Sequence, residues 1–153
     1  LEGRSLETVV IPVGNGALIN GVARWVKAAS PGTRVIGVCA AGADAMEKSW
    51  SGDEIVVRKR VDTSAEGIAV RVPVPEAVTD MRPLVDGMVL VSDEEMYRAM
   101  RLILETTGLV VEPSGATGVA ALMTDRAGPY RGTVATVLTG NNMTLDQMRQ
   151  WLL

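Results

Sequence analysis

A glycine-rich turn between an apolar run and a helical pattern constrains this chain more than any other stretch. Residues 8–11 are all β-branched, and Pro12 ends that run. Gly14 and Gly16 follow and are able to take positive φ, and a helical pattern starts at about residue 17. A strand, a tight turn and a helix start in this order direct free backbone N–H groups toward an anion. The turn predicts a phosphate-binding site, with an ordinary strand-to-helix turn as the alternative.

The spacing of the glycines disfavours two common nucleotide motifs. Gly14, Gly16 and Gly21 do not match the GxGxxG pattern of dinucleotide sites, and no Gly-Lys-Ser/Thr ending follows them. Neither NAD nor ATP is therefore favoured as the ligand.

Composition narrows the class of protein further. The 153 residues are 47% hydrophobic and 22% charged, which predicts one globular domain with a sizeable core. A net charge of −3 with mixed signs argues against a nucleic-acid partner. The sequence contains no uninterrupted apolar run of about 18 residues, so no membrane span is predicted. The absence of histidine excludes imidazole zinc sites and Ser-His-Asp catalysis. The single cysteine, Cys39, excludes an internal disulfide and indicates a reducing, cytoplasmic setting.

Strand-like runs alternate with helical patterns along the whole chain, which predicts a doubly wound, mainly parallel α/β sheet. The predicted first helix places Leu18, Val22, Trp25 and Val26 on one face. The expected strands cover residues 9–13, 34–39, 55–58, 88–91, 109–111 and 134–138. The expected helices cover residues 17–29, 43–50 and 77–84, the stretch between a Ser92/Glu95 capping box and Gly108, residues 116–124, and a last segment capped by Asn142 or Thr144 and ending at Trp151.

Three polar or glycine-rich turns follow predicted strands. They are residues 14–17, 112–115 and 139–142. Because ligands bind beyond the carboxyl ends of parallel strands, these turns are expected to meet at one edge of the sheet and form a binding site.

Six segments, taken in order over nearly the whole chain, resemble a known family. They are PVGNGALING, RVIGVCAAGAD, SAEGIAV, LVDGMVLVSDEEM, LVVEPSGATGVAAL and VLTGNN. Together they resemble the fold type II pyridoxal-phosphate enzymes, most closely the threonine and serine dehydratase group, which includes serine racemase. The resemblance implies a three-layer α/β fold, the large C-terminal domain of a tryptophan-synthase-β-like enzyme.

The resemblance also implies the cofactor, pyridoxal 5'-phosphate, and the residues that bind it. Backbone amides of the first turn would hold the cofactor phosphate, at Gly14, Asn15, Gly16, Ala17 and Leu18. The family has a run of glycines here, so Asn15 and Ala17 fit only if they need no positive φ, or if Asn15 supplies it. Thr139 takes the place of the serine or threonine that hydrogen-bonds the pyridine nitrogen.

The hydroxyl at Thr139 has a consequence for the chemistry. It does not hold the pyridine nitrogen protonated as a carboxylate would, so the ring is a weaker electron sink. This favours β-elimination, in which the β-substituent of a hydroxy amino acid leaves as the α-proton departs. The alternative is that Thr139 is a turn residue bonding its own backbone.

Two further positions are candidates for the pocket wall. The family places a glutamate similar to Glu112 close to the cofactor, although a solvated or capping glutamate is the alternative. Gly67 matches a family segment that passes beside the cofactor ring.

The chain departs from the family at a metal site. Serine racemase-like members bind a divalent cation through a glutamate and an aspartate, and here the matching positions are Cys39 and Ala45, with only a carbonyl offered by Ala43 between them. A hard cation needs carboxylate oxygens, so no metal is expected. The side chain of Asp44 is expected to point elsewhere, and Cys39 is expected to be a small buried hydrophobe rather than a nucleophile.

The larger departure concerns the Schiff-base lysine of the family. None of the lysines, Lys27, Lys48 and Lys59, lies in a lysine motif of the family. The chain also begins with Leu1. Residues 1–153 are therefore expected to form a single α/β domain, the C-terminal part of a longer enzyme whose N-terminal part is missing, and to be inactive alone.

The expected function is that of a cytoplasmic threonine or serine dehydratase, which forms a 2-oxo acid and ammonia from a small amino-acid substrate. A homo-oligomer is expected. One alternative is another fold type II enzyme: a racemase, a threonine synthase-like protein or a β-replacement enzyme. The others are a non-catalytic α/β module that binds a different phosphate ligand, and an inert proteolytic fragment.

Overall fold

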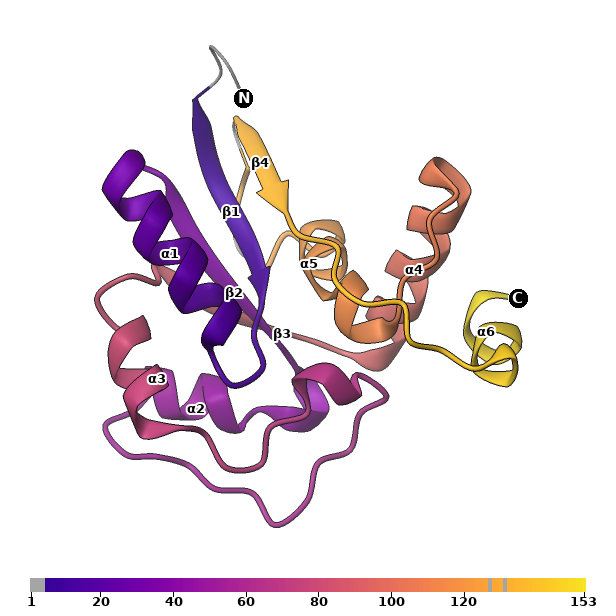
Figure 1. Cartoon of the computed structure of the whole chain (residues 1–153), viewed down its shortest axis with the longest axis horizontal. Helices are drawn as coiled ribbons and strands as arrows, with labels where there is room; N and C mark the ends of the chain where they lie inside the picture. Colours follow the sequence, from indigo (N-terminus) through magenta and orange to yellow (C-terminus); the bar gives the residue numbers. More distant parts are fainter. Residues whose placement is uncertain (1–4, 127, 131) are drawn as a thin grey trace.

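The centre of the molecule is a parallel β-sheet (Figure 1). The computed structural model describes residues 5–126, 128–130 and 132–153. Within these residues the sheet has four strands in the order β3-β2-β1-β4. The strands are β1 (Leu6–Pro12), β2 (Arg34–Ala40), β3 (Gly87–Val91) and β4 (Thr133–Thr136). All three pairings are parallel, which confirms the predicted α/β class.

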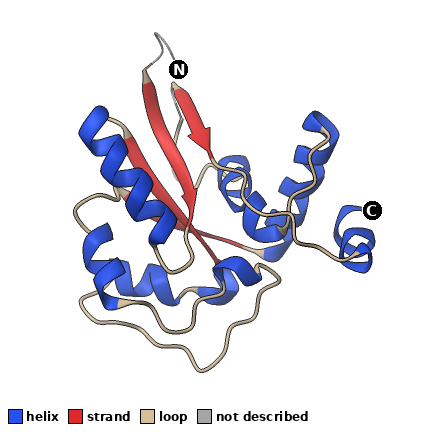
Figure 2. Cartoon of the chain, viewed as in Figure 1, coloured by secondary structure: helices blue, strands red, loops and turns tan. Residues whose placement is uncertain are grey.

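Helices separate the strands and cover both faces of the sheet (Figure 2). They are α1 (Ala17–Ala29), α2 (Ala45–Ser51), α3 (Pro75–Met81), α4 (Asp93–Thr107), α5 (Pro113–Met123) and α6 (Leu145–Leu152), with short 3₁₀ turns η1 (Ala41–Ala43) and η2 (Glu66–Ile68). None of these helices is long and apolar enough to cross a membrane, as far as the described residues extend.

Alternate strand residues face two separate cores. Val9, Ile11 and Val13 pack with side chains of α1, α2 and α3 on one face. Val10 points to the other face, where α4, α5 and α6 supply the partners. Burial on both faces explains why the strands read as continuous apolar runs rather than alternating ones.

Helix α4 shows how local sequence sets the ends of an element. The Ser92 hydroxyl accepts from the Glu95 N–H, and the Glu95 carboxylate accepts from the Ser92 N–H, so the predicted capping box is present. Gly108 ends the helix in the left-handed conformation, with φ of 74°. Of the two predicted caps of the last helix, Asn142 and Thr144, the structure selects Thr144, which forms a second capping box with Gln147.

The strand order positions the binding edge. The chain winds from β1 to β2 and β3 on one side, then returns through α4 and α5 to place β4 on the other side of β1. The direction of winding therefore reverses at β1, and ligands of such sheets bind in the crevice at that point.

Two predicted strands are wrong. Residues 55–58 form a loop, where the Val56 N–H donates to the Ser49 hydroxyl and the Arg58 N–H donates to the Arg71 carbonyl. Residues 109–111 are a short extended link between α4 and α5. Both stretches are apolar and β-branched, but neither reaches an edge of the sheet, and a strand needs that pairing.

The predicted face of α1, which holds Leu18, Val22, Trp25 and Val26, is not the face that packs on the sheet. The buried residues are Ile19, Asn20, Ala23 and Val26, whereas Leu18 is 40% and Trp25 is 71% exposed. Apolar residues form two adjacent stripes on this helix, and periodicity does not say which one faces the sheet.

Candidate functional site

A cavity of about 270 Å³ lies beyond the carboxyl ends of β1 and β4. We call it the glycine-turn cavity. Its walls come from the turn after β1, the η2 segment, the start of α5 and the turn after β4. Its lining residues are Pro12, Gly14, Asn15, Gly16, Ala17, Leu18, Gly67, Ile68, Glu112, Ser114, Thr139 and Gly140. The structure thus places every candidate site residue from the sequence on one cavity.

The N-terminus of α1 opens into this cavity with its amides uncapped. Gly16 is the N-cap residue and has φ of 89°, which favours glycine. No described side chain caps it, and the first turn holds no acidic residue. The first N–H groups of the helix and the positive end of its dipole are therefore available to an anion.

Gly14 is needed for space rather than for positive φ. Its φ is not positive, unlike that of Gly16. A Cβ added at Gly14 would lie 3.1 Å from the Gly67 carbonyl oxygen, so a side chain would push the η2 segment away. This corrects the expectation that both glycines serve the turn by positive φ.

Asn15 and Ala17 sit in the turn without positive φ. The Asn15 side chain accepts a hydrogen bond of 3.1 Å from the Val74 N–H, which ties the turn to the start of α3. Leu18 borders the cavity and is partly exposed there. The two non-glycine residues are compatible with this turn because the left-handed position belongs to Gly16 alone.

Glu112 holds the turn that carries Thr139. Its Oε2 accepts from the Asn142 N–H at 3.1 Å, and its own N–H donates to the Gly140 carbonyl at 3.1 Å. A Cβ at Gly140 would overlap Oε1 of Glu112, and one at Gly115 would overlap the Thr139 carbonyl. The turn is therefore packed directly on the start of α5, and Thr139 borders the cavity as a half-buried residue.

Sequence reasoning missed Ser114. It is 4% exposed, lies in the first turn of α5, and accepts a hydrogen bond of 3.0 Å from the Gly67 N–H. The available signal was a serine between Pro113 and Gly115 at the start of a helix of small residues, where a side chain points toward the ligand edge of the sheet.

A second cavity of about 330 Å³ lies beside the first and shares Gly67, Glu112 and Ser114 with it. We call it the outer cavity. Its other lining residues are Ser64, Glu66, Pro113, Asn142, Met143, Gln147 and Trp151. Trp151 of α6 stacks on Tyr97 of α4, with ring centroids 5.3 Å apart.

The lysines lie elsewhere. Lys27 Nζ binds the Asp86 carboxylate at 2.7 Å, and Lys48 Nζ lies 3.3 Å from Glu47. Neither these two nor Lys59 lines the glycine-turn cavity or the outer cavity as described.

Cys39 and Asp44 have structural surroundings. Cys39 is fully buried, as predicted, and burial raises the pKa of its thiol to about 12. Asp44 accepts two hydrogen bonds of 2.8 Å from the Arg58 guanidinium, which lower the pKa of the carboxyl. Over the described parts of the chain, no three acidic, histidine or cysteine side chains gather closely enough to hold a metal ion.

Several known proteins are similar to this chain in sequence and in fold. The pattern of the pyridoxal-phosphate dependent enzyme family matches residues 2–140. The L-threonine ammonia-lyase of Geobacter sulfurreducens is 38% identical over 135 residues, which cover 88% of this chain and 34% of that protein. The processed form of threonine deaminase isoform 2 from Solanum lycopersicum superposes with a TM-score of 0.89 at 30% identity, over 97% of this chain and 42% of the other. Maize serine racemase superposes with a TM-score of 0.87 at 28% identity, over 95% and 46% of the two chains.

The chain spans between about a third and a half of the length of these relatives. The family pattern nevertheless covers every residue that lines the glycine-turn cavity, from Pro12 to Gly140. Sequence pattern, strand order and the position of the cavity agree, and the chain belongs to the family of pyridoxal-phosphate dependent enzymes.

Proposed function

We propose that this chain is the cofactor-binding part of a lyase that deaminates threonine or serine by β-elimination, giving a 2-oxo acid and ammonia. One observation carries the proposal: three turns far apart in the sequence form one cavity, with an uncapped helix N-terminus at one side and Thr139, from the turn after β4, bordering it. The relatives named threonine ammonia-lyase and threonine deaminase support the substrate class.

The residues of the cavity fit pyridoxal phosphate. The amides at the start of α1, with Gly16 in the left-handed conformation and no acidic residue in the first turn, suit a phosphate dianion. The Thr139 hydroxyl suits a neutral ring nitrogen, to which it can donate. Gly14 and Gly67 let the walls of the cavity pack closely, because a Cβ at Gly14 would lie 3.1 Å from the Gly67 carbonyl oxygen and one at Gly67 would lie 3.0 Å from Ser114 Oγ.

Each residue has a defined task in this proposal. When bound, the cofactor supplies the electron sink for breaking the bond to the α-hydrogen. The α1 amides anchor the phosphate, and Thr139 orients the ring without placing a proton on its nitrogen. Glu112 holds the 139–142 turn in register through the Asn142 N–H. A weak sink suits substrates whose β-hydroxyl leaves together with the α-proton.

We further propose that the lysine that carries the cofactor lies outside residues 1–153, because Lys27 and Lys48 are engaged elsewhere and Lys59 lines neither cavity. The chain would then be a single domain, the C-terminal part of the intact enzyme, and inactive alone. A homo-oligomer and a cytoplasmic location belong to the same proposal, the latter because a lone buried thiol suits a reducing compartment.

The second candidate is a racemase of the same family, supported by the similarity to maize serine racemase. The test uses the intact product of the gene. Incubation with pyridoxal phosphate and L-threonine or L-serine is expected to release a 2-oxo acid and ammonia in equal amounts. A protein that binds the cofactor and yields D-serine but no 2-oxo acid would contradict the lyase and support the racemase.

A further inference from the structure

Ser114 connects two segments that the glycine-turn cavity needs to keep together. Its hydroxyl oxygen accepts the Gly67 N–H at 3.0 Å, across 47 residues of sequence. The side chain is at the start of α5 and is 4% exposed, whereas Gly67 itself is exposed. The bond therefore joins a buried, rigid helix to an exposed segment of the cavity wall.

The fit at Gly67 is close. A Cβ added there would lie 3.0 Å from Ser114 Oγ and 3.2 Å from Ser114 Cβ. Because Gly67 has no side chain, its backbone can pack directly against Ser114. The hydrogen bond and the glycine act together to set the distance between η2 and α5.

The contact continues to the phosphate end of the cavity. The Gly67 carbonyl faces Gly14, where an added Cβ would lie 3.1 Å from that oxygen. Ser114, Gly67 and Gly14 thus form a continuous line of contacts from α5 to the turn before α1. All three line the glycine-turn cavity.

We infer that Ser114 is a positioning residue of the cofactor site, which holds Gly67 so that the η2 segment closes the cavity beside the glycine turn. The inference rests on the proposed function only in taking pyridoxal phosphate as the ligand of this cavity. It assigns no chemical step to Ser114. Its effect is local, because Gly67 is exposed and water can replace the lost partner of its N–H.

The test is the variant Ser114→Ala in the intact protein. Without the acceptor, hydrogen exchange of the peptide covering residues 64–70 is expected to become about tenfold faster in the cofactor-free protein. The apparent dissociation constant for pyridoxal phosphate, read from its absorbance, is expected to rise about tenfold, which corresponds to about 1.4 kcal/mol.

Thr117→Val is the matched control. Thr117 is a fully buried residue on the same helix, and its hydroxyl donates to the Pro113 and Ser114 carbonyls and also lies 3.4 Å from Met96 Sδ on α4, but it has no partner in the η2 segment as described. This variant is expected to leave exchange of residues 64–70 and the cofactor dissociation constant within about twofold of wild type, because the partners of the hydroxyl lie on α4 and α5 and not in residues 64–70.

A double-mutant cycle with Gly67→Ala separates the effect of the Ser114–Gly67 contact from a general loss of stability. The new methyl collides with Ser114 Oγ, so Gly67→Ala alone is expected to weaken cofactor binding. Ser114→Ala removes the 3.0 Å contact with Oγ and keeps only the 3.2 Å contact with Cβ, so the crowding is partly relieved and the double variant is expected to bind better than the sum of the two single losses predicts.

Unchanged exchange and unchanged affinity in Ser114→Ala would overturn the inference, as would equal losses in Thr117→Val or strict additivity in the cycle. The proposed function fails separately: a wild-type protein that binds pyridoxal phosphate but forms no 2-oxo acid contradicts the lyase, while the ratio of dissociation constants still decides the role of Ser114.

Discussion

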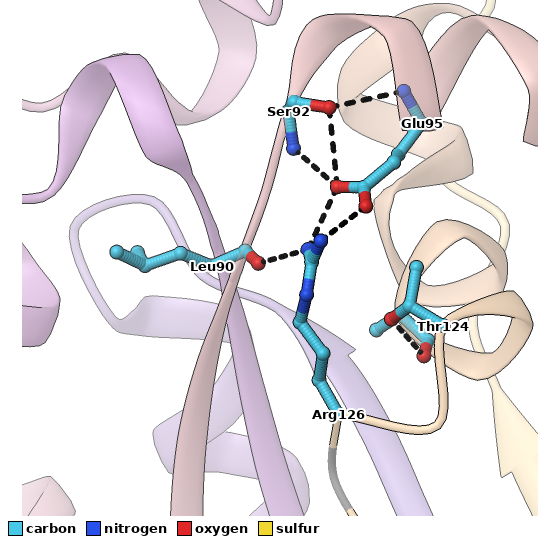
Figure 3. Close-up of polar contacts among 6 residues, drawn as sticks. Leu90, Ser92, Glu95, Thr124 and Arg126 are labelled. Carbon is cyan, nitrogen blue, oxygen red and sulfur yellow. Dashed lines mark hydrogen bonds and ion pairs between the residues drawn. The ribbon is translucent and has the colours of Figure 1, made fainter.

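Arg126 forms a bidentate salt bridge with the carboxylate of Glu95, donating a hydrogen bond from each of its terminal nitrogens (Figure 3). Nη1 lies 2.7 Å from Oε2, Nη2 contacts Oε1, and Nη1 also donates to the Leu90 carbonyl at 2.8 Å. The Glu95 side chain is only 10% exposed and serves at the same time in the capping box with Ser92. Glu95 and Arg126 together therefore tie the end of β3 and the start of α4 to the segment that follows α5.

Replacing Arg126 with alanine is expected to destabilise the protein by about 2 kcal/mol. The change leaves a nearly buried carboxylate without its cation, although the exposed half of the arginine reduces the cost relative to a fully buried pair. Urea unfolding of the intact protein measures the effect. Arg149→Ala, which removes the exposed partner of Asp146, is the control and is expected to change stability by less than about 0.5 kcal/mol. Equal losses in the two variants would contradict a special role for the Glu95 pair.

The same pair predicts a dependence of stability on pH. Burial by itself would raise the pKa of Glu95, but the hydrogen bonds from Arg126 and Ser92 outweigh it and hold the pKa below its ordinary value. A carboxyl whose pKa is lower in the folded state binds fewer protons there than in the unfolded chain. Its stabilisation is complete above the unfolded pKa, about 4.3, and is lost as the pH falls through the lower folded value.

Glu95→Gln removes this titration while keeping a side-chain acceptor for the cap. The difference in unfolding free energy between wild type and Glu95→Gln is expected to shrink as the pH falls from about 6 to about 3. Urea unfolding of both proteins, measured across that pH range, determines this difference. A difference that stays constant with pH would show that the charge of Glu95 does not contribute.

Features set by neighbouring residues could be predicted from the sequence. The turn with Gly16, the capping box of Ser92 and Glu95, and the left-handed stop at Gly108 all depend on a few consecutive residues, and all are present. The ends of the confirmed strands and helices differ from the predicted ones by at most three residues. Frayed ends explain such differences.

Features set by contacts between distant residues could not be predicted from the sequence. Residues 55–58 and 109–111 have strand composition, but pairing depends on where other segments leave an open edge. The hydrogen bond between Ser114 and Gly67 spans 47 residues, and neither segment carries a sequence pattern that predicts contact with the other. The same is true of α1, where contact with the sheet selected the stripe of Ile19, Ala23 and Val26.

Cys39 is expected to be inert in the folded protein. A fully buried thiol with a pKa of about 12 is almost entirely protonated at neutral pH, and the thiolate is the reactive form. Iodoacetamide at pH 8 is expected to leave the native protein unlabelled over an hour and to label it in denaturant, as mass spectrometry would show. Labelling at equal rates in both states would contradict the buried position.

Replacing Thr139 tests the proposed partner of the ring nitrogen. Thr139→Val keeps the shape but loses the hydroxyl, and cofactor affinity is expected to fall about tenfold, as the loss of one hydrogen bond of about 1–1.5 kcal/mol implies. Thr139→Asp is expected to hold a proton on the ring nitrogen, and therefore to raise racemisation of serine relative to 2-oxo acid formation. The ratio of the two products measures this. An unchanged ratio in Thr139→Asp would contradict the role of the residue.

Gly16 and Gly21 form a matched pair on the first turns of α1. Gly16 has φ of 89°, and a Cβ there would lie 3.1 Å from the Ala77 Cβ, so Gly16→Ala is expected to cost about 1–2 kcal/mol of stability and to weaken phosphate binding. Gly21 lies inside the helix with nothing within 4 Å of an added Cβ. Gly21→Ala is therefore expected to stabilise the protein by about 0.5–1 kcal/mol. Urea unfolding and titration with pyridoxal phosphate separate the two, because only Gly16→Ala is expected to change the dissociation constant. If Gly21→Ala weakened cofactor binding as much as Gly16→Ala does, the effect would come from the helix as a whole and not from the amides at its start.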